Sequence, residues 1–85
     1  MKNSILNIMM LFLTMPAFAQ KENQEIVKGN EAYRGGEFSK AVDSYRKALL
    51  ITPGNTTALF NLGNALYMNG DKEEAEKIFT GIIES

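Results

Sequence analysis

The frame Gly-Asn-x-x-Tyr-x-x-Gly occurs twice in this chain of 85 residues, at 29–36 and at 63–70, so that the copies differ by a shift of 34 in residue number. The same shift superimposes Ala41 on Ala75 and Tyr45 on Phe79. Self-similarity at a period of about 20 to 50 residues indicates a repeat architecture, in which each unit buries its apolar face against its neighbour. We therefore predict two copies of one supersecondary unit.

Apolar residues inside each copy recur with the period of an α-helix. The clearest stripes comprise Phe38, Ala41, Val42, Tyr45, Ala48 and Leu49, and then Ala75, Ile78, Phe79, Ile82 and Ile83. No segment alternates with period two, so the sequence predicts no strand. The fold class is therefore all-α, with helices at about 23–34, 38–51, 56–68 and 72–84.

The breaks between these helices carry turn residues. Gly35-Gly36 and Asn69-Gly70 supply a residue that reaches the left-handed conformation with no Cβ penalty. Residues 52–55, Thr-Pro-Gly-Asn, predict a turn whose φ is preset by proline. Asp71, with Glu74 three residues later, has the form of a capping box. Turns this short require consecutive helices to run antiparallel.

Residues 1–19 have the pattern of a secretory signal peptide. Lys2 precedes an apolar run from Ile5 to Met15, and Ala17-Phe18-Ala19 forms an A-x-A cleavage site. We expect cleavage after Ala19, a disordered lead-in at 20–22, and export to the periplasm of a Gram-negative cell or secretion from another cell. The alternative is an uncleaved membrane anchor, although the run is shorter than the ~20 residues that a spanning helix needs.

Composition excludes several classes of function. The chain has no Cys and no His, which removes thiol nucleophiles, imidazole bases and the usual zinc ligand sets. A formal net charge of -1 gives no electrostatic argument for nucleic-acid binding. The acidic residues at 71–76 are explained by a helix start, where acids face the positive end of the dipole. We expect no enzyme, no cofactor and no metal.

A helix-turn-helix unit with a period of about 34 residues resembles the tetratricopeptide repeat (TPR) family. Positions that match the family signature are Gly29, Ala41, Tyr45, Ala48 and Pro53 in the first repeat, and Leu59, Leu62, Gly63, Leu66, Ala75 and Phe79 in the second. The first repeat departs from it at Glu25 and Lys28, where a large apolar pair is usual, and the second at Ile82, where Ala is usual. The resemblance implies two stacked helical hairpins, at 23–55 and 56–85, the second incomplete at its C-terminal end.

The resemblance also implies a binding surface, because TPR proteins bind peptides or partner proteins along the concave side formed by their first helices. The family's groove positions correspond here to Ile26, Asn30, Tyr33, Arg34, Phe60, Asn61, Asn64, Tyr67 and Met68. Asn side chains can bond an extended peptide through both donor and acceptor, and Tyr adds contact area at low entropic cost. In the alternative, the asparagines tie adjacent repeats together and the tyrosines pack between helices.

A narrower resemblance comes from the stretch KGNEAYRGGEFSKAVDSYRKALLITPGN after the apolar leader. It is similar to the exported TPR proteins of the Bacteroides aerotolerance (Bat) group. That resemblance implies an envelope protein with a role in oxygen tolerance, whose partner is a membrane protein.

The C-terminal helix suggests a second way to associate. Ile82 and Ile83 continue its apolar stripe to a point where a repeat array normally ends in a polar cap. Three hypotheses follow: a binding module that holds another protein, a unit that self-assembles end to end through Ile82 and Ile83 into a homo-oligomer, and a shortened product of a longer TPR protein.

Overall fold

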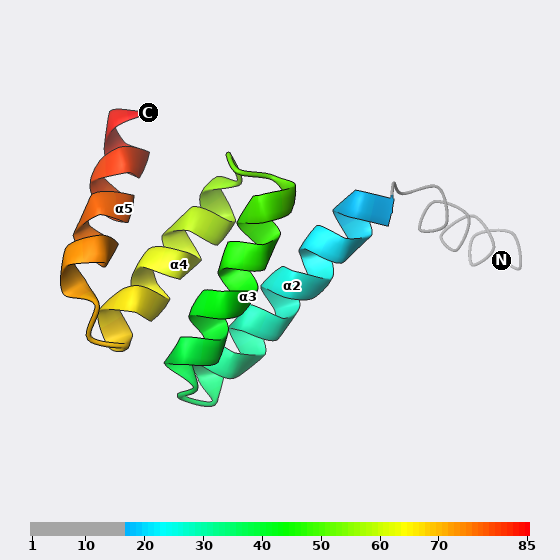
Figure 1. Ribbon diagram of the computed structural model, residues 1–85, viewed down its shortest axis with the longest axis horizontal. Coiled ribbons are helices and arrows are strands. Elements are labelled where there is room, and N and C mark those ends of the chain that lie inside the picture. The colour runs from blue at the N-terminus through cyan, green and yellow to red at the C-terminus, as the bar shows by residue number, and fades with distance from the viewer. Residues whose placement is uncertain (1–16) are drawn as a thin grey trace, which may run out of the picture.

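The computed structural model describes residues 17–85, and within this range it contains four α-helices and no strand. The helices are α2 (Ala17–Arg34), α3 (Phe38–Ile51), α4 (Thr56–Met68) and α5 (Lys72–Glu84). They pack in chain order, α2 on α3, α3 on α4 and α4 on α5, and each runs antiparallel to the one before it (Figure 1). The all-α prediction is confirmed, and α3, α4 and α5 have the predicted bounds.

Helix α2 begins earlier than predicted, at Ala17 rather than residue 23, and includes 20–22. The expectation of a disordered lead-in there is wrong. Residues 17–28 contain no Gly or Pro and are rich in Ala, Gln, Lys and Glu, which are good helix formers. The predicted signal peptide lies outside the described residues over 1–16. Across 17–85, no helix combines the length and the hydropathy needed to cross a membrane.

The first and third turns close with the same hydrogen-bonded motif. In the first, the Gly36 amide donates to the carbonyl of Tyr33 at 3.0 Å, and the Glu37 amide donates to Ala32 at 2.8 Å. In the third, Gly70 donates to Tyr67 at 3.1 Å and Asp71 to Leu66 at 2.9 Å. This is the Schellman motif, which needs a left-handed residue. Gly36 and Gly70 supply it, with φ of 76° and 92°, as the sequence predicted.

The middle turn is tied down from two sides. The side chain of Asn55 caps α4 by accepting a 3.0 Å hydrogen bond from the Ala58 amide. The carboxylate of Glu22, in α2, accepts from the Thr52 hydroxyl at 2.6 Å and also from the Asn55 side-chain amide. These bonds anchor the start of α2 to the α3–α4 turn, which is a second reason why 20–22 is helical.

The predicted capping box at the start of α5 does not form. Asp71 occupies the N-cap position, but its side chain makes no capping hydrogen bond. It accepts instead from the Asn69 amide at 3.0 Å. Glu74 forms an ion pair with Arg46 of α3 at 2.6 Å. Both side chains therefore act across the turn or between repeats.

Each hairpin is closed by an aromatic ring that lies on a glycine. A Cβ atom built on Gly29 would lie 2.5 Å from Cε1 of Tyr45, and one built on Gly63 would lie 2.5 Å from Cε1 of Phe79. The shift that relates the two sequence copies therefore also relates these two contacts. Any side chain at these glycines would push the ring away, so the repeated glycine allows the two helices of each hairpin to approach closely.

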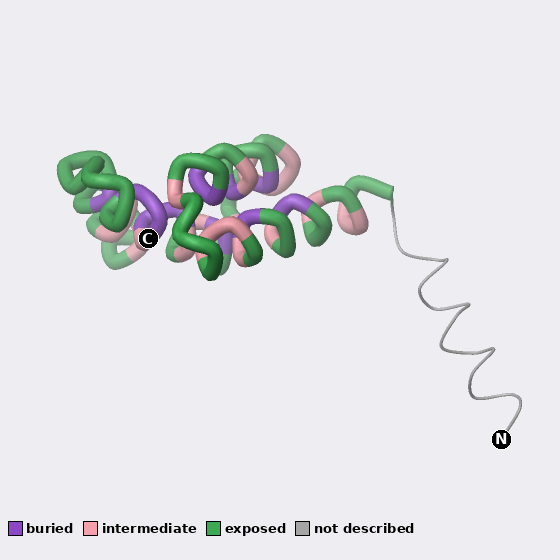
Figure 2. The backbone as a smooth tube through the Cα atoms, turned by 90° about the horizontal axis from the view of Figure 1, so that it is seen from below, coloured by how far each residue is buried: buried purple, intermediate pink, exposed green. Residues whose placement is uncertain are grey.

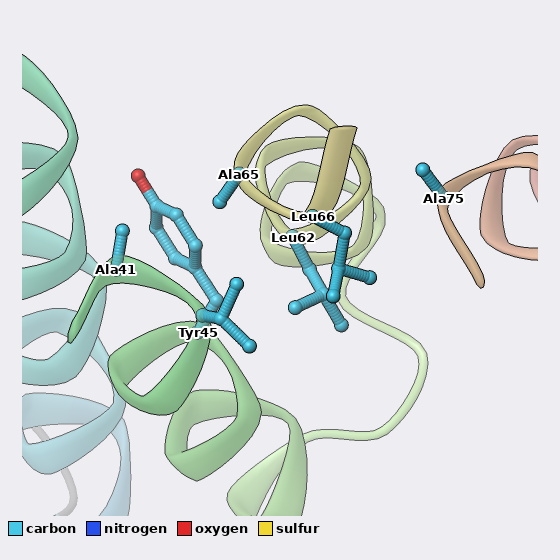
Figure 3. Packing of buried hydrophobic residues seen from close by; sticks show 7 residues of the cluster. Ala41, Tyr45, Leu62, Ala65, Leu66 and Ala75 are labelled. Atoms are coloured by element: carbon cyan, nitrogen blue, oxygen red, sulfur yellow. The ribbon is translucent and has the colours of Figure 1, made fainter. Parts of the chain in front are cut away.

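One buried cluster joins the two hairpins. Its members are Ala41, Val42, Tyr45, Leu62, Ala65, Leu66 and Ala75. In Figure 3, the ring of Tyr45 points between Ala41 of its own helix and Ala65 of α4. Buried and exposed positions alternate along each helix, as expected for helices that present one stripe to a common core (Figure 2).

Candidate functional site

A small polar depression lies on the side formed by α2 and α4. It has a volume of about 190 Å³ and is lined by Asn30, Tyr33, Arg34, Tyr45, Asn61 and Asn64. Five of these six residues were predicted as groove positions from the sequence. Pockets for drug-sized molecules usually have about 300 Å³ or more. The polar depression therefore has the size for a side chain or a turn of a longer ligand.

Asn30 is the structural centre of the depression. Its side-chain oxygen accepts a 2.5 Å hydrogen bond from the hydroxyl of Tyr45 and a 3.4 Å bond from the amide of Asn61. These bonds connect α2, α3 and α4. Burial raises the pKa of Tyr45, so its hydroxyl stays protonated at neutral pH and remains the donor. The alternative from the sequence, that this asparagine ties repeats together, describes Asn30 well.

Asn64 is the counterpart of Asn30 in the second repeat, but its surroundings differ. The counterpart of Tyr45 is Phe79, which has no hydroxyl to donate. Among the described residues Asn64 makes no hydrogen bond through its side chain, and it is only half-buried. Its amide donors and its oxygen are therefore open to a ligand in the polar depression.

Arg34 carries the only charge among the six lining residues. Its side chain is exposed, and it forms no ion pair with another described residue. Guanidinium groups bind carboxylates through two parallel hydrogen bonds. The polar depression thus combines a free cation with a free amide, which suits an acidic or strongly polar ligand group.

The other predicted groove residues lie outside the depression. Ile26 is half-buried, and Phe60, Tyr67 and Met68 are each more than half exposed. Phe60 lies toward α5, with its ring centre 6.0 Å from that of Phe79. Lys72 lies over the ring of Tyr67 at 5.3 Å. The surface predicted as one groove is therefore divided into a polar part beside α2 and an apolar part beside α5.

The apolar part borders a second hollow, the apolar groove, of about 340 Å³. It is lined by Tyr67, Lys72, Ala75, Glu76, Phe79, Thr80 and Ile83. Of the two residues predicted as an assembly end, Ile83 lies here and is 84% exposed. Ile82 is half-buried and does not line the groove, because it is the second-repeat counterpart of buried Ala48 and occupies the equivalent inward position.

Sequence reasoning treated Tyr45 only as a packing residue, whereas it also forms the floor of the polar depression. A difference between the two repeats could have indicated this role. Tyr45 carries a hydroxyl that its counterpart Phe79 lacks, and a hydroxyl is not needed merely to fill space. Within 17–85 no three potential metal-binding side chains converge, and in the acidic segment at 71–76 Glu74 pairs with Arg46.

Comparison with known proteins points to one family. A family model described as "TPR repeat" matches residues 29–70, and another described as "Tetratricopeptide repeat" matches 57–85. The chain is also 47% identical over 47 residues to a protein of Arabidopsis thaliana described as "Inactive TPR repeat-containing thioredoxin TTL3". That match covers 53% of this chain and 7% of the relative's length. No solved structure matches the chain.

Proposed function

Because residues 29–85 belong to the tetratricopeptide repeat family, whose repeats generally act as non-catalytic protein-interaction modules, we propose that this chain binds a peptide segment of a partner protein in the polar depression. The observation that carries the proposal is the pair of unused polar groups there, the guanidinium of Arg34 and the amide of Asn64. Beside them, the side chains of Asn30 and Tyr45 are already hydrogen-bonded to each other.

The chemistry of the depression narrows the ligand class. Arg34 favours a carboxylate, and Asn64 can bond a peptide N–H and a peptide C=O together. Tyr33 packs edge-on against Phe38, with ring centres 5.3 Å apart, and so offers a fixed aromatic wall. We therefore expect an extended peptide that places Asp or Glu beside Arg34.

A display library of random peptides, selected on the purified protein, supplies the probe. The selected peptides should be enriched in Asp and Glu, and their affinities can be measured by fluorescence anisotropy. Arg34→Glu should weaken binding about tenfold or more by replacing attraction with repulsion. Asn64→Ala should weaken it about threefold to tenfold.

Lys47→Glu is the matched control, because Lys47 is an exposed cation on α3 that does not line the depression. It makes the same charge reversal as Arg34→Glu and should change affinity less than about twofold. Selected peptides that bind equally well to wild type, Arg34→Glu and Asn64→Ala would place the binding site elsewhere and reject the proposal.

The proposed setting is the cell envelope. The pattern of residues 1–19 supports export, and the resemblance of the following stretch to the Bat group supports an envelope membrane protein as partner in an aerotolerance-type complex. Cleavage after Ala19 would leave Glu22 in the chain, and with it the link to Thr52 and Asn55.

Export is tested by expressing the full chain in a Gram-negative host and measuring the mass of the protein in the periplasmic fraction. The mass should correspond to a chain that begins at Gln20. Recovery of the intact chain from the cytoplasm alone would contradict export, and would leave the peptide-binding proposal unaffected.

A further inference from the structure

Helix α4 covers an apolar face of the first hairpin. That face is formed by Ala41, Val42 and Tyr45 of α3, with Tyr33 and Leu49 packed against the same cluster. Under α4, Tyr45 is 2% exposed and Val42 is 5% exposed. The side chains of α4 at this contact therefore show which residues a helix needs in order to pack on such a face.

The second hairpin repeats this face, but Tyr67 and Ile83 at its rim are exposed, whereas Ala75 is buried and Phe79 is half-buried. The repeat shift turns Tyr33, Ala41, Tyr45 and Leu49 into Tyr67, Ala75, Phe79 and Ile83, which all line the apolar groove. Helix α5 lies at the outer edge of the row of helices (Figure 1). Half-buried Leu49 corresponds to Ile83, which is 84% exposed, so no described helix packs on Ile83 as α4 packs on the first face.

The buried stripe of α4 specifies the side chains of a helix that fits such a face. It consists of Ala58, Leu62, Ala65 and Leu66, all at most 4% exposed. Ala65 lies beside the ring of Tyr45, and Leu62 and Leu66 fill another part of the same buried cluster (Figure 3). The spacing i, i+4, i+7, i+8 belongs to one face of a helix.

The groove differs from the first face at one position that matters for recognition. Glu76 replaces buried Val42, and it forms no ion pair with another described residue. An occupant with a Lys or Arg beside its apolar stripe would meet this carboxylate. Lys72 lies over the ring of Tyr67, and it would have to give up that contact to pair with Glu76.

A second copy of this chain, stacked head to tail, does not meet these requirements. It would bring α2 to the groove, and the residues of α2 that correspond to Ala58, Leu62 and Ala65 are Gln24, Lys28 and Glu31. All three are exposed polar residues. Burying Lys28 and Glu31 against the apolar groove would be costly without partners for both charges.

We propose that the apolar groove binds an amphipathic helix of a partner protein, with a small-x3-Leu-x2-small-Leu stripe flanked by a basic residue. This surface is separate from the polar depression and uses other side chains. One partner could occupy both, but each has its own chemistry and its own test.

The probe is a synthetic peptide with the sequence of residues 56–68, extended by Ala- and Lys-rich turns because isolated helices shorter than about 12 to 15 residues are marginal. Anisotropy should show binding to the purified protein. The same peptide with both leucines of its stripe changed to Lys should not bind. Ile83→Lys in the protein should weaken binding about tenfold or more, because it puts a charge into the apolar contact.

Leu50→Lys provides a matched control, since Leu50 is 83% exposed on α3 and does not line the groove. It should change affinity less than about twofold. Glu76→Lys should weaken the Lys-flanked peptide about threefold, and a Glu-flanked peptide should restore binding to that variant. Arg34→Glu, which tests the polar depression, should have no effect on this peptide.

Binding that is unchanged by Ile83→Lys would overturn the proposal. Sedimentation equilibrium supplies the other decisive result. If the protein without peptide is a dimer that Ile83→Lys dissociates, a second copy occupies the groove and the partner-helix proposal is wrong. A monomer that binds the peptide through Ile83 and Glu76 supports it.

Discussion

Gly29 and Gly63 show how single residues define this fold. Both are buried in the middle of a helix, where glycine is normally unfavourable by about 1 kcal/mol relative to alanine. Each is retained at a site where a methyl group would overlap an aromatic ring. The unfavourable helix propensity is offset by the close contact of the two helices.

Gly29→Ala should therefore destabilise the protein, although alanine favours the helix. The new Cβ would lie 2.5 Å from a ring atom of Tyr45, and that ring is 2% exposed and has little freedom to move. Overpacking of this kind costs about 1 to 3 kcal/mol, and the better helix propensity of alanine offsets about 1 kcal/mol of it, so we expect a net loss of up to about 2 kcal/mol in the free energy of unfolding. Urea denaturation followed by circular dichroism measures it.

Gly81→Ala is the matched control for this substitution. Gly81 lies within α5, and a Cβ there would meet no atom within 4 Å. Here only the helix propensity changes, so the free energy of unfolding should rise by about 0.5 to 1 kcal/mol. A loss of stability at Gly81, or a gain at Gly29, would refute the steric explanation of the repeated glycines.

At the level of helices and turns, the sequence was informative wherever a local rule determines the structure. The bounds of α3, α4 and α5 followed from apolar periodicity and from Gly36 and Gly70, whose positive φ angles end α2 and α4. Apolar periodicity did not show the early start of α2, which has two causes: the good helix formers at 17–28, and the contact of Glu22 with the distant turn at 52–55, which no local rule reveals. The capping box at Asp71 failed for the second of these reasons, since Arg46 of another helix pairs with Glu74.

The link between Glu22 and the middle turn predicts a dependence of stability on pH. Hydrogen bonds from Thr52 and then Asn55 lower the pKa of Glu22. Its carboxylate therefore favours the folded state above its ordinary pKa, and the contribution disappears as the pH falls through the lowered pKa. Thermal unfolding between neutral and acidic pH should show this loss in wild type.

Glu22→Gln isolates this effect, because the substitution keeps an acceptor but removes the titrating group. At neutral pH the variant should be less stable than wild type, and the difference between them should shrink as the pH falls through the lowered pKa of Glu22. An equal difference at neutral and acidic pH would show that the charge of Glu22 does not contribute to folding.

For the whole molecule, the repeat shift explains both where the two hairpins agree and where they differ. Five residues that the sequence predicted as groove positions line the polar depression together: Asn30, Tyr33, Arg34, Asn61 and Asn64. The sequence could not show which of them are already used, because the bonds from Tyr45 and Asn61 to Asn30 join three helices. The sequence also did not show that the polar depression and the apolar groove are two separate surfaces. That separation depends on the packing of α4 against the first hairpin and on the exposed residues beside α5.

The most direct test of the peptide-binding proposal is a titration of ¹⁵N-labelled protein with a selected acidic peptide, followed by amide chemical shifts. The proposal predicts that the largest changes fall on Arg34, on Asn61 and on the backbone and side-chain amides of Asn64, with little change on the outer side of α3. Changes confined to other surfaces, with none at Arg34 or Asn64, would contradict the assignment of the polar depression as the binding site.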